Sequence, residues 1–252
     1  MTAPKVSIIT VCYNAIDTIE ETILSVIRQT YSNIEYIIID GASTDGTIEV
    51  INKYLDEIAL FVSEADDGLY EALNKGVVLA TGDWIGILNC GDLFHDSNVI
   101  SNVARIVSTI DENVGVVYGD SIEIDGDSRI PVISIHELTN KNVPPQYRHG
   151  ASFVRSNIHK EHLFDISKKY KYDYALDYLQ IYNMNKSGVK FYYISFVVLD
   201  YLKCGKSSHP LKNIYLRNLI EFDGKKSVSF FVCLWNELFT MFLNIIKKIR
   251  II

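Results

Sequence analysis

The sequence predicts an α/β fold in which a mainly parallel, Rossmann-like sheet carries helices on both faces. Short and almost continuously apolar segments alternate with segments whose apolar residues recur at helical spacing. Strands that are apolar nearly throughout are typical of parallel sheets buried on both sides. The composition agrees, because 48% of the 252 residues are hydrophobic and 22% are charged, as in an ordinary globular protein.

The first half of the chain contains most of this alternation. We expect strands at residues 5–13, 34–40, 58–64 and 83–89, and helices at 15–31, 47–57 and 69–80. Helices of this length are typical crossover connections between parallel strands. Ligands of such sheets bind beyond the carboxyl ends of the strands, so the segments that follow each strand are the candidate site.

The pattern changes near residue 113. Residues 114–135 predict two antiparallel strands joined by a Gly/Asp turn, 172–188 predict a helix that ends at Gly188, and 189–202 predict another strand. We therefore divide residues 1–210 into two halves of one domain, 1–112 and 113–210, with antiparallel strands extending the sheet.

The C-terminal segment 211–252 is predicted to be helical. Basic residues flank an apolar stretch within 225–252, and Asn236, Glu237 and Asn244 interrupt it. A membrane-spanning helix needs about 20 predominantly apolar residues, so an amphipathic helix lying on a membrane surface fits better. Packing onto the domain or onto a second subunit is the alternative, which leaves a homo-oligomer open.

Charge and cysteine content exclude several classes of protein. The net charge of -7 argues against a general nucleic-acid binder, which needs a basic face.

No signal peptide pattern precedes the first strand, which indicates a cytoplasmic protein. Four cysteines without CxxC spacing indicate neither a metal cluster nor a disulfide framework. They are Cys12, Cys90, Cys204 and Cys233.

Polar and acidic residues follow each strand of the first half, in "TVCYNA", "DGASTDGT", "SEADDG" and "NCGD". The carboxyl ends of adjacent parallel strands meet at one edge, so we expect Asp66, Asp67 and Asp92 to share a site. Asp40 can accept hydrogen bonds from a uracil N–H or from ribose hydroxyls. The residues from Ser43 onward also have the pattern of a helix N-cap.

The acidic edge indicates a divalent cation. Neither a GxGxxG fingerprint nor a Walker motif is present to hold phosphates. Mn²⁺ or Mg²⁺ binds through carboxylate oxygens together with substrate phosphate, and Asp92, with Asn89 beside it, is the candidate ligand. The alternative for Asp92 is the N-cap of a following turn.

Five stretches of the chain, "VSIITVCYNA", "YIIIDGASTDGT", "SEADDGLYEALNKG", "ATGDWIGILNCGD" and "ALDY", resemble the family 2 glycosyltransferases of bacterial surface-polysaccharide assembly. The resemblance covers about residues 5–120 and continues more weakly to about 210. It implies a GT-A type fold and inverting transfer of a sugar from a nucleotide donor, usually with Mn²⁺ or Mg²⁺. Residues 1–112 would then bind the nucleotide-sugar, and 113–210 the acceptor.

The resemblance also implies roles for individual residues at the donor site. Those expected to bind the nucleotide-sugar are Thr10, Tyr13, Asn14, Asp40, Ser43, Asp66, Asp67, Lys75, Asn89 and Gly91. Asp92 would be the metal ligand. The commoner "DADD" form of the family carries more carboxylates than "NCGD" does here, so we expect weaker metal binding.

An inverting transfer needs one side chain that deprotonates the acceptor hydroxyl. Asp173 and Asp177 fall at i, i+4 in the predicted helix, hence on one face, where both are also compatible with a solvated surface. The resemblance assigns the base to Asp177. Tyr174 beside it is expected to stack on acceptor sugars.

Two further segments resemble parts of the family. "QYRHGASFVR" resembles an "HQ" segment, which implies that His149 lines the site or approaches the metal, although a lone histidine is also compatible with a structural role. "CGKSSH" resembles a segment near the donor phosphates, which implies contacts from Lys206 or Ser207.

The expected function is transfer of a hexose from a UDP-sugar, UDP-glucose or UDP-galactose, to an undecaprenyl-diphosphate-linked saccharide. The product would be O-antigen, capsule or exopolysaccharide, made at the inner face of the bacterial plasma membrane. A non-catalytic nucleotide-sugar or polysaccharide-binding protein of the same fold is the alternative, favoured by the depleted carboxylates. A nucleotidyltransferase is disfavoured, because "KVSIITVCYNA" has no Gly-rich basic loop.

Overall fold

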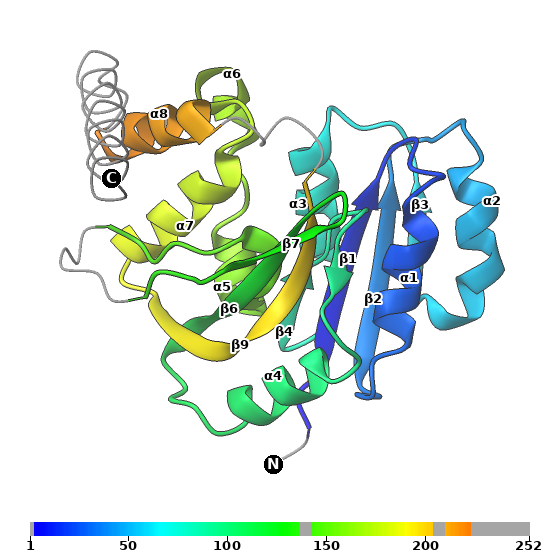
Figure 1. Ribbon diagram of the computed structural model, residues 1–252, viewed down its shortest axis with the longest axis horizontal. Helices are drawn as coiled ribbons and strands as arrows, with labels where there is room; N and C mark the ends of the chain where they lie inside the picture. Colours follow the sequence, from blue (N-terminus) through cyan, green and yellow to red (C-terminus); the bar gives the residue numbers. More distant parts are fainter. Residues whose placement is uncertain (1–2, 137–142, 204–209, 223–252) are drawn as a thin grey trace, which may run out of the picture.

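The computed structural model describes residues 3–136, 143–203 and 210–222, and within them the strands form one sheet (Figure 1). The strand order is β3-β2-β1-β4-β8-β6-β9-β5, with β7 beside β6. The strands are β1 Val6–Cys12, β2 Ile34–Asp40, β3 Leu60–Ser63, β4 Trp84–Ile87, β5 Leu93–Phe94, β6 Val114–Asp125, β7 Ser128–Val132, β8 Ser152–Arg155 and β9 Lys190–Leu202.

Helices cover both faces of this sheet. The core on one face includes residues of α1, α2 and α4, and the core on the other includes residues of α3, α7 and α8. The α-helices are α1 Ile19–Ile27, α2 Thr47–Ile51, α3 Leu69–Leu79, α4 Val99–Val107, α5 Ser156–Glu161, α6 Lys169–Tyr172, α7 Leu176–Lys186 and α8 Pro210–Glu221. Short 3₁₀ turns are η1 Asn52–Glu57, η2 His149–Ala151 and η3 Ile166–Lys168.

Strand β1 shows why both faces are covered. Val6 and Ile8 belong to the core beneath α1, whereas Ile9 and Val11 belong to the core beneath α3, as the period of two in a strand requires. Three of the four are fully buried, and each contributes about 1.5–3 kcal/mol. A Cβ on Gly76 of α3 would lie 2.5 Å from Ile9 Cγ2, so glycine permits the close approach of this helix.

The strand directions bring six strand ends to one edge. Strands β1 to β4 are parallel; β8 lies antiparallel between β4 and β6, and β9 is parallel to β6. The carboxyl ends of β1, β2, β3, β4, β6 and β9 therefore share one edge. Strand β8 begins at that same edge, so the residues just before it also lie there.

Most of the predicted elements are confirmed, with boundaries shifted by a few residues. Two expectations are wrong. Strands β3 and β4 share an edge but are not neighbours, because β2 and β1 lie between them. The helix expected at 172–188 is broken, since α6 ends at Tyr172, Asp173 has φ +50° and α7 begins at Leu176. Asp173 and Asp177 therefore do not share a helix face.

The C-terminal expectations are tested only in part. Helix α8 occupies the beginning of the segment predicted to be helical, while residues 223–252, Lys206 and Ser207 lie outside the described residues. Among the helices that the structure describes, none is long and apolar enough to cross a membrane. Strands on both sides of residue 112 share the sheet, so the division into donor and acceptor halves stays a prediction.

Candidate active site

A hollow of about 610 Å³ lies where β1, β2 and β3 end. Its walls include Tyr13, a residue that is 66% exposed, and Asp66. Gly41 lies between them, because a Cβ there would lie 2.9 Å from Asp66 Oδ2 and 3.3 Å from Tyr13 Cδ2. An exposed ring and a carboxylate with no side chain between them can stack a nucleobase and accept its N–H.

Asp40 and Thr10 are buried in the strands that lead to this hollow. Asp40 is fully buried and accepts hydrogen bonds from Ser63 Oγ at 2.7 Å, from the Ser43 N–H at 2.9 Å and from the Ser43 hydroxyl. Ser43 Oγ also accepts the N–H of Asn14 at 2.8 Å, which joins the β1 and β2 turns. Thr10 is buried, and its hydroxyl accepts from Tyr36. Neither Asp40 nor Thr10 lines the hollow.

Asp67 and Lys75 lie in other hollows than Asp66. The exposed Asp67 carboxylate forms an ion pair with Lys169 of α6, and it shares its hollow with Tyr174. Lys75 pairs with Glu64 at 2.6 Å and lines a third, open depression. The structure therefore does not bring these two side chains to the hollow formed by Tyr13 and Asp66.

The loop after β4 buries Asp92 beside the end of β9. Gly91 has φ +96°, a conformation that favours glycine, and its N–H donates to Thr22 Oγ1 at 2.9 Å. Asp92 is 6% exposed and accepts the Leu202 N–H at 3.3 Å. Burial raises the pKa of Asp92 to about 7, opposed by the Leu202 hydrogen bond and the Arg148 charge.

The same loop fits a divalent cation that takes further ligands from a substrate. The described residues contain no group of three or more His, Cys, Asp or Glu side chains that would cage a metal. They do offer the Asp92 carboxylate and the Asn89 Oδ1, a buried oxygen without a hydrogen-bond partner among them. Mg²⁺ commonly binds through one or two carboxylates plus phosphate oxygens, so this donor set fits such an ion.

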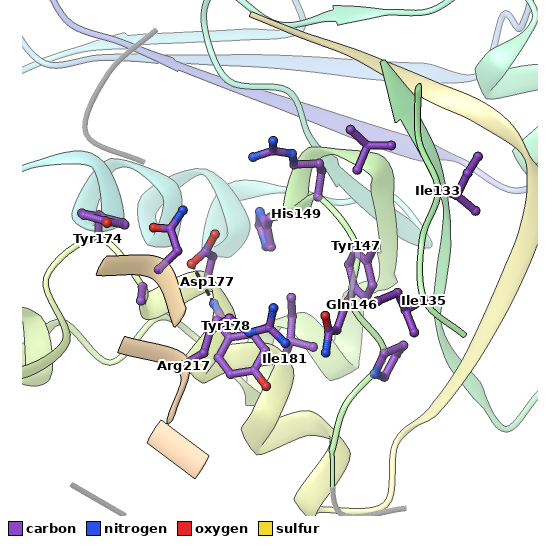
Figure 2. A pocket seen from close by; sticks show the side chains of 15 residues that line it. Ile133, Ile135, Gln146, Tyr147, His149, Tyr174, Asp177, Tyr178, Ile181 and Arg217 are labelled. Carbon is purple, nitrogen blue, oxygen red and sulfur yellow. Dashed lines mark hydrogen bonds between the residues drawn. The ribbon is translucent and has the colours of Figure 1, made fainter. Parts of the chain in front are cut away.

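A separate cavity of about 340 Å³, called the Asp177 cavity below, contains Asp177 and His149 (Figure 2). Asp177 lies in the first turn of α7 and accepts the Tyr178 N–H at 2.7 Å; His149 comes from η2, just before β8. The remaining wall residues include Ile133, Ile135, Pro145, Gln146, Tyr147, Arg148, Tyr174, Ile181, Asn213 and Arg217.

Asp177 and His149 influence each other's protonation. Burial raises the pKa of Asp177, and the neighbouring His149 opposes that rise. Burial lowers the pKa of His149, and Asp177 opposes that fall. The His149 Nε2 lies 3.4 Å from Gln180 Oε1, which orients the ring. A carboxylate whose pKa is raised is a stronger base, which suits a group that takes a proton from a hydroxyl.

Arg148 also lines this cavity, although the sequence analysis did not single it out. The guanidinium donates to Glu123 Oε2 at 2.6 Å and lies 4.1 Å from the centre of the Tyr201 ring. Both partners are distant in sequence, on β6 and β9, and nothing in the local pattern around Arg148 marks it. Its position one residue before His149 was the available signal.

Comparisons with known proteins establish the family of the chain. The model of glycosyl transferase family 2 matches residues 7–169, more than half of the chain. A PGL/p-HBAD biosynthesis glycosyltransferase of Mycobacterium tuberculosis (strain ATCC 25177 / H37Ra) is 34% identical over 125 residues, 48% of each chain. An uncharacterized glycosyltransferase of Mycobacterium tuberculosis (strain CDC 1551 / Oshkosh) is 32% identical over 161 residues, 62% of this chain and 60% of that protein. The chain thus spans about half of the first relative's length.

Solved structures share the fold. S. aureus TarS 1–349 in complex with UDP superposes with a TM-score of 0.66 at 17% identity, covering 89% of this chain and 68% of that chain. The mannosyltransferase PcManGT from Pyrobaculum calidifontis, in complex with GDP-Man and Mn²⁺, gives 0.62 at 18% identity, covering 86% and 62%. The expected GT-A type fold is therefore confirmed, and by its sequence the chain belongs to glycosyl transferase family 2.

Proposed function

We propose that the chain is an inverting hexosyltransferase that uses a UDP-sugar, UDP-glucose or UDP-galactose, and a lipid-linked oligosaccharide acceptor. The observation that carries the proposal is the Asp177–His149 pair in a cavity at the sheet edge where Asp92 is buried. An enzyme needs both a base and an anion-binding centre there, whereas a binding protein does not need the base.

In this mechanism the acceptor hydroxyl enters the cavity and gives its proton to Asp177. Its oxygen attacks the anomeric carbon on the face opposite the diphosphate. The bond from that carbon to the phosphate oxygen breaks, and its electron pair leaves with UDP. A divalent cation held by Asp92 and Asn89, when bound, supplies positive charge to the diphosphate.

The hollow formed by Tyr13, Gly41 and Asp66 is the proposed binding site for the nucleobase of the donor. Stacking of a nucleobase on Tyr13 and a hydrogen bond to Asp66 are compatible with uracil, whose N–H is a donor. TarS 1–349 has been solved with UDP and with UDP-GlcNAc, which supports a uridine nucleotide by analogy of fold alone.

The acceptor is proposed to carry undecaprenyl diphosphate and to be reached at the inner face of the plasma membrane, in O-antigen, capsule or exopolysaccharide synthesis. The exposed Ile133 and Ile135 at the rim of the cavity support an acceptor with an apolar portion. Membrane contact through residues 225–252 and a homo-oligomer remain part of the same proposal.

The test is turnover. Purified protein with Mn²⁺ is incubated with a panel of nucleotide sugars and lipid-linked saccharides, and released nucleoside diphosphate and glycosylated lipid are measured. We expect UDP release that requires the acceptor. Binding of UDP-sugars without release for any acceptor would instead support the non-catalytic alternative.

A further inference from the structure

Arg148 is a cation held rigidly at the carboxyl edge of the sheet. It lies in the segment that leads into β8, and its side chain is 30% exposed. Glu123 at the end of β6 accepts one of its N–H groups at 2.6 Å, and the Tyr201 ring on β9 lies 4.1 Å beneath it. Contacts from two strands fix both the position and the plane of the guanidinium.

The contact with Glu123 leaves donors of Arg148 available. Glu123 is shared with Lys203, whose Nζ lies 3.2 Å from Oε1 of the same carboxylate. Among the residues that the structure describes, no other carboxylate lies within ion-pair distance of Arg148. A guanidinium has five N–H donors in a fork that matches a phosphate, and the Glu123 bond engages one nitrogen of it.

Arg148 also lies between the two halves of the candidate site. It lines the cavity that contains Asp177, and Lys203, which shares Glu123 with it, follows the residue whose N–H binds Asp92. Its charge acts on both of these carboxyl groups. In the proposed mechanism, Asp177 serves the acceptor and Asp92 the diphosphate, so the bond that breaks would lie between these two groups.

We propose that Arg148 binds the diphosphate of the nucleotide donor and stabilises the negative charge that develops on it as the bond to the sugar breaks. The inference rests on the proposed function. It also accounts for a donor site with a single carboxylate in "NCGD": a fixed guanidinium supplies positive charge that a weakly held cation does not. Preorganised charge of this kind contributes most in the transition state.

Nucleotide binding tests this assignment without turnover. Calorimetry measures the affinities of UDP, UMP and uridine in EDTA, and the UDP and UMP series is repeated with Mn²⁺. We expect Arg148→Met, which keeps an aliphatic stem against Tyr201, to reduce the preference for UDP over UMP by about 10- to 100-fold, the worth of a charge-assisted hydrogen bond. Uridine affinity is expected to stay unchanged, and Arg148→Lys to lose less than the methionine variant.

Arg155→Met is the matched control. Arg155 also stacks on a ring, with its guanidinium 4.7 Å from Trp84, and it donates to the Val114 carbonyl, but it lies at the other end of β8. We expect it to leave the UDP preference unchanged. Thermal unfolding checks whether each variant is folded. If Arg148→Met does not fold, the comparison is made with Arg148→Lys.

Three outcomes separate the claims. A folded Arg148→Met protein with the wild-type preference for UDP over UMP overturns the inference and leaves the proposed function standing. Equal loss of UDP, UMP and uridine affinity also overturns it, since that result indicates a structural role. GDP and GMP are measured in parallel; wild-type protein that binds neither UDP nor GDP contradicts the proposed function and the inference together.

Discussion

Asp177 is the residue on which the proposed chemistry depends. Its carboxylate lies in the first turn of an 11-residue helix, where the Tyr178 N–H donates to it, and burial beside His149 raises its pKa. Asp173, four residues earlier, is in a strained turn and forms an ion pair with Lys212. The sequence spacing made the two look equivalent, and the break between α6 and α7 separates their roles.

Asp177→Asn is therefore expected to reduce kcat by about 10²- to 10⁴-fold, the usual contribution of a general base. UDP affinity should stay at the wild-type value, because the amide keeps the shape and loses only the basicity. Asp173→Asn is the control and should keep most of the activity. Steady-state kinetics with calorimetry of UDP binding check both, and a parallel loss of UDP affinity in Asp177→Asn would count against the assignment.

The buried Asp92 carboxylate is expected to lower the free energy of unfolding, although it is the proposed ligand of a divalent cation. Its pKa is about 7 in the folded chain, above the ordinary value of 3.8, so the folded state holds a proton that the unfolded state has released between these pH values. The contribution of Asp92 to stability is therefore fully present below about pH 4 and is lost as the pH rises through 7. Without metal, Asp92→Asn should thus be more stable than the wild type at pH 8, on the order of 2–4 kcal/mol.

Urea unfolding in EDTA at pH 8 and pH 5 measures this difference, which should shrink at the lower pH. Adding Mn²⁺ with UDP should stabilise the wild type more than the variant. A variant that is less stable than the wild type at both pH values would show that the Leu202 hydrogen bond outweighs the buried charge.

At the scale of elements, buried polar groups connect strands at the edge opposite the site. Glu35 of β2 accepts hydrogen bonds from Lys5 Nζ at 2.7 Å, from Ser7 Oγ at 2.5 Å and from the Thr81 N–H at 2.7 Å. These join β2 to β1 and to the turn before β4. Burial alone would raise the pKa of Glu35, but the hydrogen bonds outweigh it and lower the pKa to about 2.

Glu35→Gln should accordingly destabilise the protein by about 2–3 kcal/mol at pH 7. The folded pKa lies below the ordinary value of 4.5, so the stabilisation is present above pH 4.5 and is lost as the pH falls through about 2. Urea unfolding from pH 7 to pH 2 should show the difference between wild type and variant disappearing. The exposed Glu49→Gln on α2 is the control, and a pH-independent difference would contradict this account.

The elements of the first half were predictable because each strand is apolar throughout and each helix has its own period. The short antiparallel β8 was not predicted, although it decides where Arg148 and His149 lie. Its residues, Ser152–Arg155, are too few to show a pattern, and their pairing with β4 and β6 is a long-range choice. Local sequence therefore predicted that the ends of the first four strands share an edge, but not how the second half of the chain adds strands to the same sheet.

At the scale of the whole molecule, the sheet unites residues that are far apart in the chain. Asp92 accepts a hydrogen bond from Leu202, and Arg148 contacts Glu123 and Tyr201. The 3₁₀ turn that carries His149 and the first turn of α7 meet at the Asp177 cavity. A candidate site assembled in this way depends on the order of β8, β6 and β9, which no single motif contains.

The last prediction concerns the C-terminal segment and the whole chain. Deleting residues 225–252 should abolish flotation of the protein with vesicles that contain anionic lipid. The reason is that this segment combines apolar residues with basic residues on both sides, Lys225, Lys226, Lys247, Lys248 and Arg250. Replacing Lys247 and Lys248 by Glu in the full chain should weaken flotation and its dependence on salt. If the truncated chain no longer floats with the vesicles but still transfers sugar to a detergent-solubilised acceptor, the segment serves membrane contact. A truncated chain that aggregates or melts at lower temperature would instead assign it to packing against protein.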